Sequence, residues 1–223
     1  MNHLPIRSSY EAPLPISLTG SEVALVPLAA SHGDDLYALS TAKGAEDRFR
    51  YLFEQVPTRE SFEQFMIKAC ASTDPMYVAV IRKEDGRCLG RQSLMRITPD
   101  HGVIEIGNIL WGPDMAATRM ATEAFFLHAC YVFDTLGYRR FEWKCNVLNG
   151  PSRRAALRFG FRFEGVFRQH MIVKGQSRDT AWYGMLDHEW PQIKQHVERW
   201  LSPENFDDRG LQKTQLRAGS RFL

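Results

Sequence analysis

Apolar and polar residues recur along this chain with two different periods, and the period predicts where strands and helices lie. In SEVALVPL, residues 21–28, apolar residues alternate with others, which predicts a first strand. SHGDDLYALS, residues 31–40, is typical of a helix. Ser31 is a favoured N-cap residue and Asp34 stands three positions later, the spacing of a capping box.

A second helix is predicted after Pro57, where Thr58 can cap the first turn. Its apolar face is made by the i, i+3, i+4, i+7 spacing of Phe62, Phe65, Met66 and Ala69. The segment between the two helices, EDRFRYLFEQVP at residues 46–57, is aromatic and irregular.

The middle of the chain is predicted to be three adjacent antiparallel strands. Their sequences are MYVAVIR (76–82), RCLGRQSLMRIT (87–98) and GVIEIGNILW (102–111). The turns between them are EDG and PDHG.

A long helix is predicted from about Ala117 to Leu136, with one apolar stripe and with Gly137 to end it. The stripe consists of Met120, Ala124, Leu127 and Tyr131. The next strand, YRRFEWKCNV, should run parallel to its predecessor because a whole helix lies between them. The remaining predicted elements are a short helix from Asn149, two strands at 161–173 and 178–186, and an amphipathic helix at 188–201.

This order predicts an α/β fold in which a mostly antiparallel, mixed sheet contains one strand–helix–strand crossover. We find no internal repeat or linker, so residues 1–223 are expected to form a single domain. Within it, residues 1–20 read as an extended, Pro-interrupted arm and residues 202–223 as a polar tail. Ligands of such sheets tend to sit at the carboxyl ends of strands where neighbouring strands part.

Composition and charge narrow the function classes. The chain is 44% hydrophobic and has a net charge of +2, without the excess of basic residues that marks a dedicated nucleic-acid binder. No apolar run is long enough for a membrane span, and the start lacks the apolar region of a secretory signal. The four scattered cysteines contain no CxxC pair, so neither a metal site nor a disulfide framework is expected. A reduced, cytoplasmic protein is the expectation.

Two junctions have the chemistry of binding sites. GPDMAATRM connects a strand to the long helix, and backbone N–H groups at such a helix start can bind phosphate; Thr118 and Arg119 would add donors. A plain strand–helix connection is the alternative. At NGPSRRAALRFGFRFEG, Asn149 can cap a short helix, Pro151 suits its first turn and Gly160 its end.

Several of these segments resemble the GNAT superfamily of acyl-CoA-dependent N-acetyltransferases, in the branch that includes the RimJ/RimL ribosomal-protein acetyltransferases. Four segments are similar to that branch and follow one another in the order expected of it: RFRYLFEQVPTRESFEQFMIKA, IEIGNILW, ATEAFF and NGPSRRAALRFGFRFEG. The similarity covers roughly residues 22–190. It implies the GNAT fold, with helices on both faces of the sheet and with fourth and fifth strands that splay apart around the crossover.

The resemblance also implies where acetyl-CoA would bind. Its pantetheine arm would lie between the fourth and fifth strands and pair with Ile109, Leu110 and Trp111. Its pyrophosphate would sit on the loop at residues 115–121, which includes Ala117, Thr118, Arg119, Met120 and Ala121. Asn149 matches the family's asparagine near the pantetheine, and Ser152 a serine close to the thioester sulfur.

One segment departs from the family pattern. The phosphate loop of the family usually reads Arg/Gln-x-x-Gly-x-Gly/Ala, whereas this chain has DMAATRMA, with Ala117 and Arg119 in the region where glycines are expected. Glycine allows close approach of the backbone to a phosphate. Side chains of Thr118 and Arg119 can offset its loss, or the loss weakens CoA binding.

The implied mechanism is direct transfer from the thioester to a neutral amine, with backbone N–H groups of the fourth strand stabilising the oxyanion. Ser152 is the candidate acid for the leaving thiolate; its alternative role is to serve only the start of its helix. Glu105 and His170 are the candidate bases, and a structural role remains open for each. The branch pattern places a Glu after the histidine, where this chain has Met171.

Other residues have two interpretations each. Trp111 and the residues Phe49, Tyr51 and Phe53 can wall an acceptor pocket or belong to the core. Arg153 and Arg154 can meet the adenosine phosphates or be solvated.

The hypothesis from the sequence is an acetyl-CoA-dependent N-acetyltransferase that acts on a primary amine of a small molecule or a protein N-terminus, without metal, nucleic-acid or membrane partners. Its rival is a catalytically silent CoA-binding or regulatory module of the same fold. A longer acyl donor and a homodimer formed through the tail remain open.

Overall fold

The computed structural model describes residues 8–216 and 218, and their contacts divide the chain into two compact units. The β2–β5 unit contains Pro13–Ile97 and Glu105–His128. The β6–β8 unit contains the chain up to Ala12, Thr98–Ile104 and the chain from Ala129 onward. The expectation of a single domain stays a prediction.

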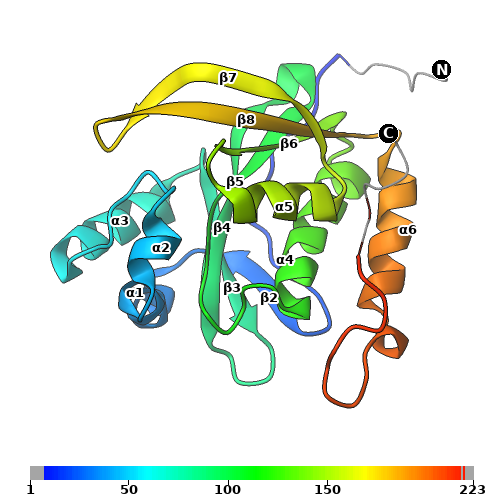
Figure 1. Cartoon of the computed structure of the whole chain (residues 1–223), viewed down its shortest axis with the longest axis horizontal. Coiled ribbons are helices and arrows are strands. Elements are labelled where there is room, and N and C mark those ends of the chain that lie inside the picture. The colour runs from blue at the N-terminus through cyan, green and yellow to red at the C-terminus, as the bar shows by residue number, and fades with distance from the viewer. Residues whose placement is uncertain (1–7, 217, 219–223) are drawn as a thin grey trace. The chain divides into compact units, whose positions relative to one another are not determined.

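Eight strands and six α-helices are present in the described residues, together with short 3-10 turns and one π-helical turn (Figure 1). The strands are β1 (Leu18–Thr19), β2 (Val23–Pro27), β3 (Met76–Arg82), β4 (Cys88–Thr98), β5 (Val103–Trp111), β6 (Arg140–Asn146), β7 (Arg162–Val173) and β8 (Gln176–Leu186). The helices are α1 (Gly33–Thr41), α2 (Ala45–Phe49), α3 (Arg59–Ala71), α4 (Arg119–Cys130), α5 (Gly150–Phe159) and α6 (Trp190–Leu201). Because β1 precedes it, the strand that the family resemblance makes the fourth is β5.

The strands of the β2–β5 unit follow one another in the order β1-β2-β3-β4-β5. β1 pairs antiparallel with β2, β2 with β3 and β3 with β4. Between β3 and β4, Val80 lies opposite Gly90 but Ile81 lies opposite Cys88, so Leu89 is an extra residue in β4. The three antiparallel strands predicted for the middle of the chain correspond to β3, β4 and β5.

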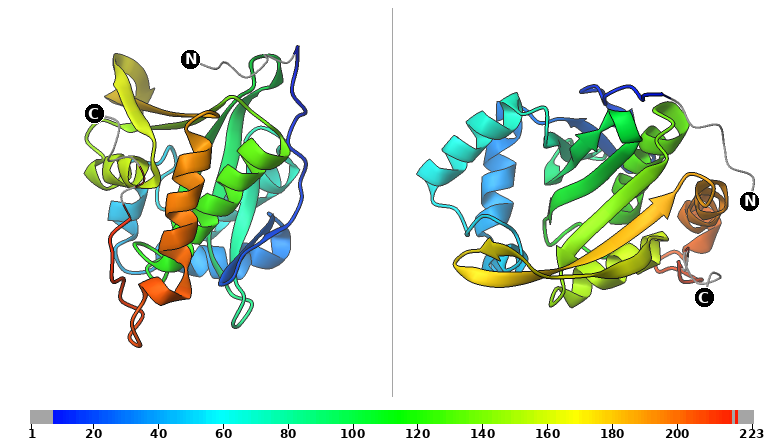
Figure 2. Two further views of the ribbon diagram at one scale, coloured as in Figure 1. Left: turned by 90° about the vertical axis from the view of Figure 1, so that its right-hand side faces the viewer. Right: turned by 90° about the horizontal axis from the view of Figure 1, so that it is seen from above.

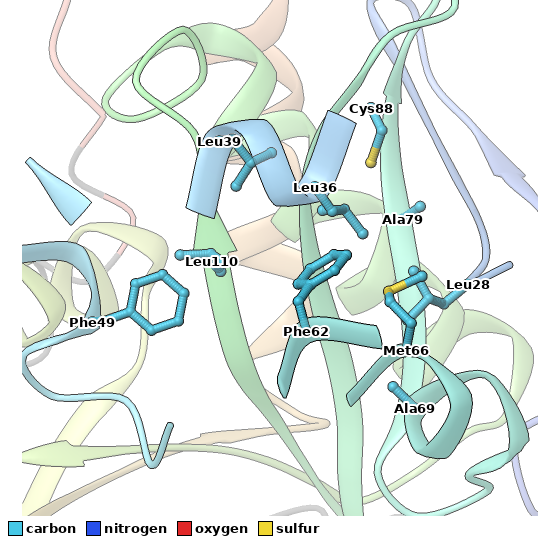
Figure 3. Packing of buried hydrophobic residues seen from close by; sticks show 10 residues of the cluster. All are labelled: Leu28, Leu36, Leu39, Phe49, Phe62, Met66, Ala69, Ala79, Cys88 and Leu110. Carbon is cyan, nitrogen blue, oxygen red and sulfur yellow. The ribbon is translucent and has the colours of Figure 1, made fainter. Parts of the chain in front are cut away.

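Both faces of these strands are covered, as their alternating side chains require. On one face α1, α2 and α3 contribute Leu36, Phe49, Phe62 and Met66 to a cluster that includes Ala79 and Leu110 (Figure 3). On the opposite face Val78 and Val80, the neighbours of Ala79, pack with Ala121 and Ala124 of α4. The helix predicted at 31–40 and the helix predicted after the cap at Thr58 therefore cover the same face of the sheet.

The β6–β8 unit is built on strands in the order β6-β8-β7, all antiparallel. β7 and β8 form a long hairpin that turns at Lys174 and Gly175 (Figure 2). Aromatic rings form much of its core; Phe133 stacks on Trp190 at 5.2 Å between centroids, and Phe161 packs against both Phe141 and Trp143. α6 contributes Trp190, Ile193, Val197 and Trp200 along one face, as its predicted amphipathic pattern requires.

Two local predictions about helices need correction. Ser31 does not cap α1, because residues 30–32 form a 3-10 turn and the N-cap of α1 is His32. The Ala29 N–H donates to His32 Nδ1 at 3.1 Å, so the histidine ring takes the part that an acidic side chain three residues after the N-cap takes in a capping box. The long helix also changes form: after Cys130 it widens into a π-helical turn, Tyr131–Thr135, before Gly137.

Part of each terminal segment can be described. Residues 1–7, 217 and 219–223 of the predicted arm and tail lie outside the described residues. In the described part of the tail, Trp200 Nε1 donates to Gln212 Oε1 and to the Thr214 carbonyl, both at 3.0 Å. Residues 212–214 of the tail therefore pack against the end of α6.

Close packing of β4 against β5 leads to a stability prediction at Gly90. A Cβ atom built there would lie 2.5 Å from the Leu110 carbonyl oxygen and 3.0 Å from the Trp111 Cα. Because both neighbours are backbone atoms, Gly90→Ala should lower the free energy of unfolding by about 1–3 kcal/mol in urea titrations.

Gly165→Ala is the matched control, since a Cβ there meets nothing within 4 Å. It should change the free energy of unfolding by less than about 0.5 kcal/mol. Equal effects of the two substitutions would show that the β4–β5 approach is not tight at Gly90.

Candidate functional site

A bulge interrupts β5 at its centre. Asn108 has a φ of 51°, in the left-handed region that residues with side chains rarely adopt. Ile104, Glu105 and Ile106 before it are all buried. A non-glycine residue in this conformation persists only where its surroundings hold it there, so the contacts of the bulge are informative.

Two side chains of β4 hold this bulge. Ser93 Oγ donates to the Gly107 carbonyl at 3.1 Å and accepts from Asn108 Nδ2 at 3.1 Å. Arg91 Nη1 donates to the Asn108 carbonyl at 2.9 Å. Two consecutive carbonyls of β5 are thereby bound by residues two positions apart on the neighbouring strand.

Gln92, between these two residues, organises the opposite face. Its Oε1 accepts from Trp111 Nε1 at 3.1 Å, and its Nε2 donates to the Ala124 carbonyl at 3.0 Å and contacts His128 Nδ1 at 2.9 Å. An indole nitrogen can only donate and a carbonyl can only accept, which fixes the orientation of the amide and makes His128 Nδ1 the acceptor. Full burial lowers the pKa of His128 to about 3, so its ring is neutral.

The loop between β5 and α4 contains a residue in the left-handed conformation that glycine adopts most readily, and this residue is an alanine. Ala117 has a φ of 63°. Thr118 Oγ1 donates to the Met115 carbonyl at 2.6 Å and accepts from the Ala121 N–H at 3.4 Å, so it acts as the cap of α4. Met120 is half-buried and Ala121 buried, and the helix start has the shape that receives a phosphate in other proteins.

Arg119 is already engaged in an ion pair. Its Nη1 lies 3.0 Å from Glu22 Oε1. Burial raises the pKa of the Glu22 carboxyl, while Arg119 opposes the rise. Arg119 would therefore have to share its charge between Glu22 and a phosphate.

The glutamate of ATEAFF has a structural role. Glu123 is buried, and its carboxylate accepts from the backbone N–H groups of Ser21, Glu22 and Val23 at 2.6–2.8 Å. Charge-assisted bonds of this kind are stronger than neutral ones. They attach α4 to the start of β2.

In the β6–β8 unit, the start of α5 has the predicted cap. Asn149 Oδ1 accepts from the Ser152 N–H at 3.1 Å, and Gly160 ends the helix with a φ of 103°. Ser152 Oγ is 2.9 Å from Trp143 Nε1. Because an indole only donates, the serine oxygen accepts this bond and keeps its own proton for another acceptor. Burial raises the pKa of the Cys145 thiol, while Ser152 opposes the rise.

The two candidate bases have different environments. Glu105 is buried, and its Oε2 accepts from Arg96 Nη1 at 2.7 Å. His170 is exposed on β7; its Nδ1 lies 3.1 Å from Thr180 Oγ1 and its ring packs edge-on against Phe167. Glu105 is therefore part of a partly buried ion pair with Arg96, whereas His170 is open to solvent.

The other candidate residues divide between core and surface. Phe49 is buried in the cluster of Figure 3, whereas Tyr51 is half-buried and Phe53 exposed. Arg153 Nε donates to the Tyr183 hydroxyl at 3.2 Å and Arg154 is exposed. Phe49 is thus a core residue, and Arg153 has a structural contact.

The predicted site residues form two groups, one in each unit. Glu105, Ile109–Trp111 and Ala117–Ala121 belong to the β2–β5 unit. Asn149, Ser152 and His170 belong to the β6–β8 unit. Sequence reasoning missed Arg91, Gln92 and Ser93, although three polar residues in the middle of an otherwise apolar strand were a visible signal.

The described residues contain no helix of the length and apolarity needed to cross a bilayer. They also contain no cluster of three or more His, Cys, Asp or Glu side chains that could hold a metal ion.

Comparison with known proteins gives consistent matches. Residues 22–162 match the family model described as an acetyltransferase (GNAT) domain. A GCN5-related N-acetyltransferase from Brucella melitensis is 56% identical, with a TM-score of 0.93 over 94% of this chain and 96% of that one. An uncharacterised N-acetyltransferase of Bacillus subtilis (strain 168), YnaD, is 28% identical over 63% of this chain and 81% of its own length.

A more distant structure has ligands in its title. The microcin C7 self-immunity acetyltransferase MccE, solved in complex with acetyl-CoA and AMP, is 22% identical, with a TM-score of 0.66 over 75% of this chain and 93% of that one. At this identity the similarity shows the fold alone. The matches confirm the predicted fold class, a mixed, mostly antiparallel open sheet with helices.

The buried His128 leads to a prediction about pH. In the fold the imidazole stays neutral down to a pKa of about 3, whereas in the unfolded chain it binds a proton near 6.5. Its contribution to stability is therefore complete above about pH 6.5 and is lost as pH falls toward 3. The loss should approach roughly 1.4 kcal/mol per pH unit within this window.

His128→Asn replaces the titrating acceptor with an amide oxygen and provides the comparison. The variant should lose less unfolding free energy than the wild type between pH 7 and pH 4, whatever its stability at pH 7. Parallel pH profiles of the two proteins would contradict a neutral, buried His128.

Proposed function

Because the chain belongs to the GNAT acetyltransferase family, we propose that it moves an acetyl group from acetyl-CoA to a primary amine, on a small molecule or a protein N-terminus. The observation that carries the choice of donor is the loop before α4. Ala117 has a left-handed conformation, which glycine adopts most readily, so this loop keeps a glycine-type turn although the glycines of the family pattern are absent. The acetyl-CoA in the MccE structure adds support from a protein of the same fold.

Each group of residues has a part in the proposed binding of the donor. The backbone of Ile109–Trp111 pairs with the pantetheine, and the capped start of α4 at Ala117–Ala121 binds the pyrophosphate. Asn149 contacts the pantetheine arm. Trp111 is well suited to border it, because Gln92 fixes its indole from one side.

The proposed chemistry is addition followed by elimination. The amine nitrogen bonds to the carbonyl carbon while charge develops on the carbonyl oxygen, where backbone N–H groups of β5 stabilise it. When the C=O bond re-forms, the C–S bond breaks and the CoA thiolate leaves. His170, or a water ordered by Glu105, takes the proton of the amine.

Ser152 supplies the proton to the thiolate in this scheme. Its oxygen accepts from Trp143 Nε1, which leaves its hydroxyl hydrogen directed elsewhere. A serine that served only the helix start would not need this second contact, because its backbone N–H already binds Asn149.

The first experiment is a thermal unfolding titration with acetyl-CoA, with CoA and ATP as comparisons. At about 100 times the dissociation constant, acetyl-CoA should stabilise the protein by roughly 2.7 kcal/mol. ATP carries phosphates and adenine without the pantetheine arm, and should have a much smaller effect. No shift at millimolar acetyl-CoA would contradict the proposed donor and would favour a regulatory module that keeps the fold without binding CoA.

Ser152→Ala tests the acid. Because proton donation acts in the transition state, kcat should fall by about 10²-fold while the KM for acetyl-CoA changes little, measured with an amine that gives turnover in a screen. Trp143→Phe is the control: it breaks the same hydrogen bond but keeps the hydroxyl, so it should cost less. Equal losses in both variants would reduce Ser152 to a helix-start residue.

A further inference from the structure

Arg91 is a cation in the interior of the β2–β5 unit, with only 3% of its surface exposed. One arm of the guanidinium, Nη1, donates to the Asn108 carbonyl at 2.9 Å, and the other, Nη2, to Glu54 Oε1 at 3.0 Å. The rings of Phe65 and Tyr77 lie against it, at 4.5 Å and 5.5 Å from Cζ to the centroids. A planar fork between two oxygens and two rings is a geometry that arginine satisfies and lysine does not.

The contacts of Arg91 and Ser93 fix two consecutive peptide groups of β5. In a regular strand successive carbonyls point to opposite sides. Here the Gly107 carbonyl binds Ser93 and the Asn108 carbonyl binds Arg91, so both face β4. The bulge at Asn108 produces this change of direction.

The direction of the N–H groups follows from peptide geometry. The cis bond of the described residues is Asp74-Pro75, so the bonds at the bulge are trans, and in a trans peptide the N–H points opposite to the C=O. The N–H groups of Asn108 and Ile109 therefore both point away from β4. Two adjacent N–H groups on one side form a concavity suited to an oxyanion.

We propose that Arg91 is a positioning residue for acetyl transfer, which holds the Asn108–Ile109 peptide so that the Ile109 N–H meets the acetyl oxygen. This rests on the proposed function. As the amine bonds to the carbonyl carbon, the electron pair of the C=O bond moves to the oxygen and is stabilised by that N–H. The pair returns when the C–S bond breaks and the thiolate takes a proton. Arg91 touches neither substrate and acts through the peptide.

Glu54 connects Arg91 to another segment of the chain. It lies in the irregular stretch between α2 and α3. One oxygen binds Arg91, and the other is buried without a hydrogen-bond partner among the described residues. Removal of Arg91 alone would leave a carboxylate without compensation, which is strongly destabilising.

The test therefore uses the charge-matched double variant Arg91→Met/Glu54→Gln, together with Arg91→Lys. The reaction is the hydrolysis of acetyl-CoA, with water in the place of the amine, followed by release of the CoA thiol. Rates are measured at a temperature at which circular dichroism shows each variant folded. Arg82→Met is the control, because Arg82 is also ion-paired but its partner, Asp85, lies in the β3–β4 turn.

We expect the double variant to lose about 10- to 100-fold in kcat, part of the effect of deleting an oxyanion donor, with less than about a threefold change in the KM for acetyl-CoA. Arg91→Lys keeps the charge near the Asn108 carbonyl and should lie between the double variant and the wild type. Arg82→Met should match the wild type.

Two results would overturn the role of Arg91 while the proposed function stands. One is an unchanged kcat in a folded double variant, and the other is a loss in kcat that a proportional rise in KM accompanies. If the wild-type protein neither binds nor hydrolyses acetyl-CoA, the proposed function fails, and the role of Arg91 fails with it.

Discussion

The structure of the β2–β5 unit depends on the hydrogen bonds of three buried polar residues at the centre of β4. A buried polar group without a hydrogen-bond partner lowers the free energy of unfolding by about 1–3 kcal/mol, a large part of the total stability of a domain. Each of these side chains must therefore have partners. Arg91 and Ser93 bind consecutive carbonyls of β5 on one face, and Gln92 binds Trp111 and α4 on the other. The two faces of one strand thus fix both the bulge and the end of β5.

The start of α4 is attached by a second set of charge-assisted bonds. Glu123 accepts hydrogen bonds from three backbone N–H groups at the start of β2, and Arg119 pairs with Glu22. The left-handed turn at Ala117 is therefore held in two ways. Thr118 caps the helix directly after it, and Glu123 and Arg119 attach that helix to the start of β2. This turn is left-handed without a glycine, and the side chain of Thr118 holds it by contacts with Met115 and Ala121.

Much of the fold was predictable because it rests on local patterns. The cap at Thr58, the cap at Asn149 and the end at Gly160 each depend on residues within one helical turn. The cap at Ser31 was wrong because residues 30–32 form a 3-10 turn, which moves the N-cap of α1 to His32. Strand positions followed from alternation, which is a property of neighbouring residues.

The site was less predictable because its geometry depends on contacts between distant residues. Nothing near Asn108 in the sequence indicates a left-handed residue inside a strand, since the cause lies fifteen to seventeen residues earlier, at Ser93 and Arg91. The pairing of Glu105 with Arg96, and of Arg119 with Glu22, likewise requires the sheet to be formed. The assignment of Asn149 and Ser152 came from a resemblance, and the bond from Trp143 adds a physical reason for the serine.

In the proposed mechanism the bulge of β5 presents the Ile109 N–H to the acetyl oxygen. The most direct measurement is the amide proton shift of Ile109 in protein labelled with ¹⁵N-isoleucine, assigned by the signal that Ile109→Val removes. CoA and acetyl-CoA differ by the acetyl group, so acetyl-CoA should move this signal further downfield than CoA does, as expected for a new hydrogen bond. Identical shifts with both ligands at saturation would contradict a hydrogen bond from the Ile109 N–H to the acetyl oxygen.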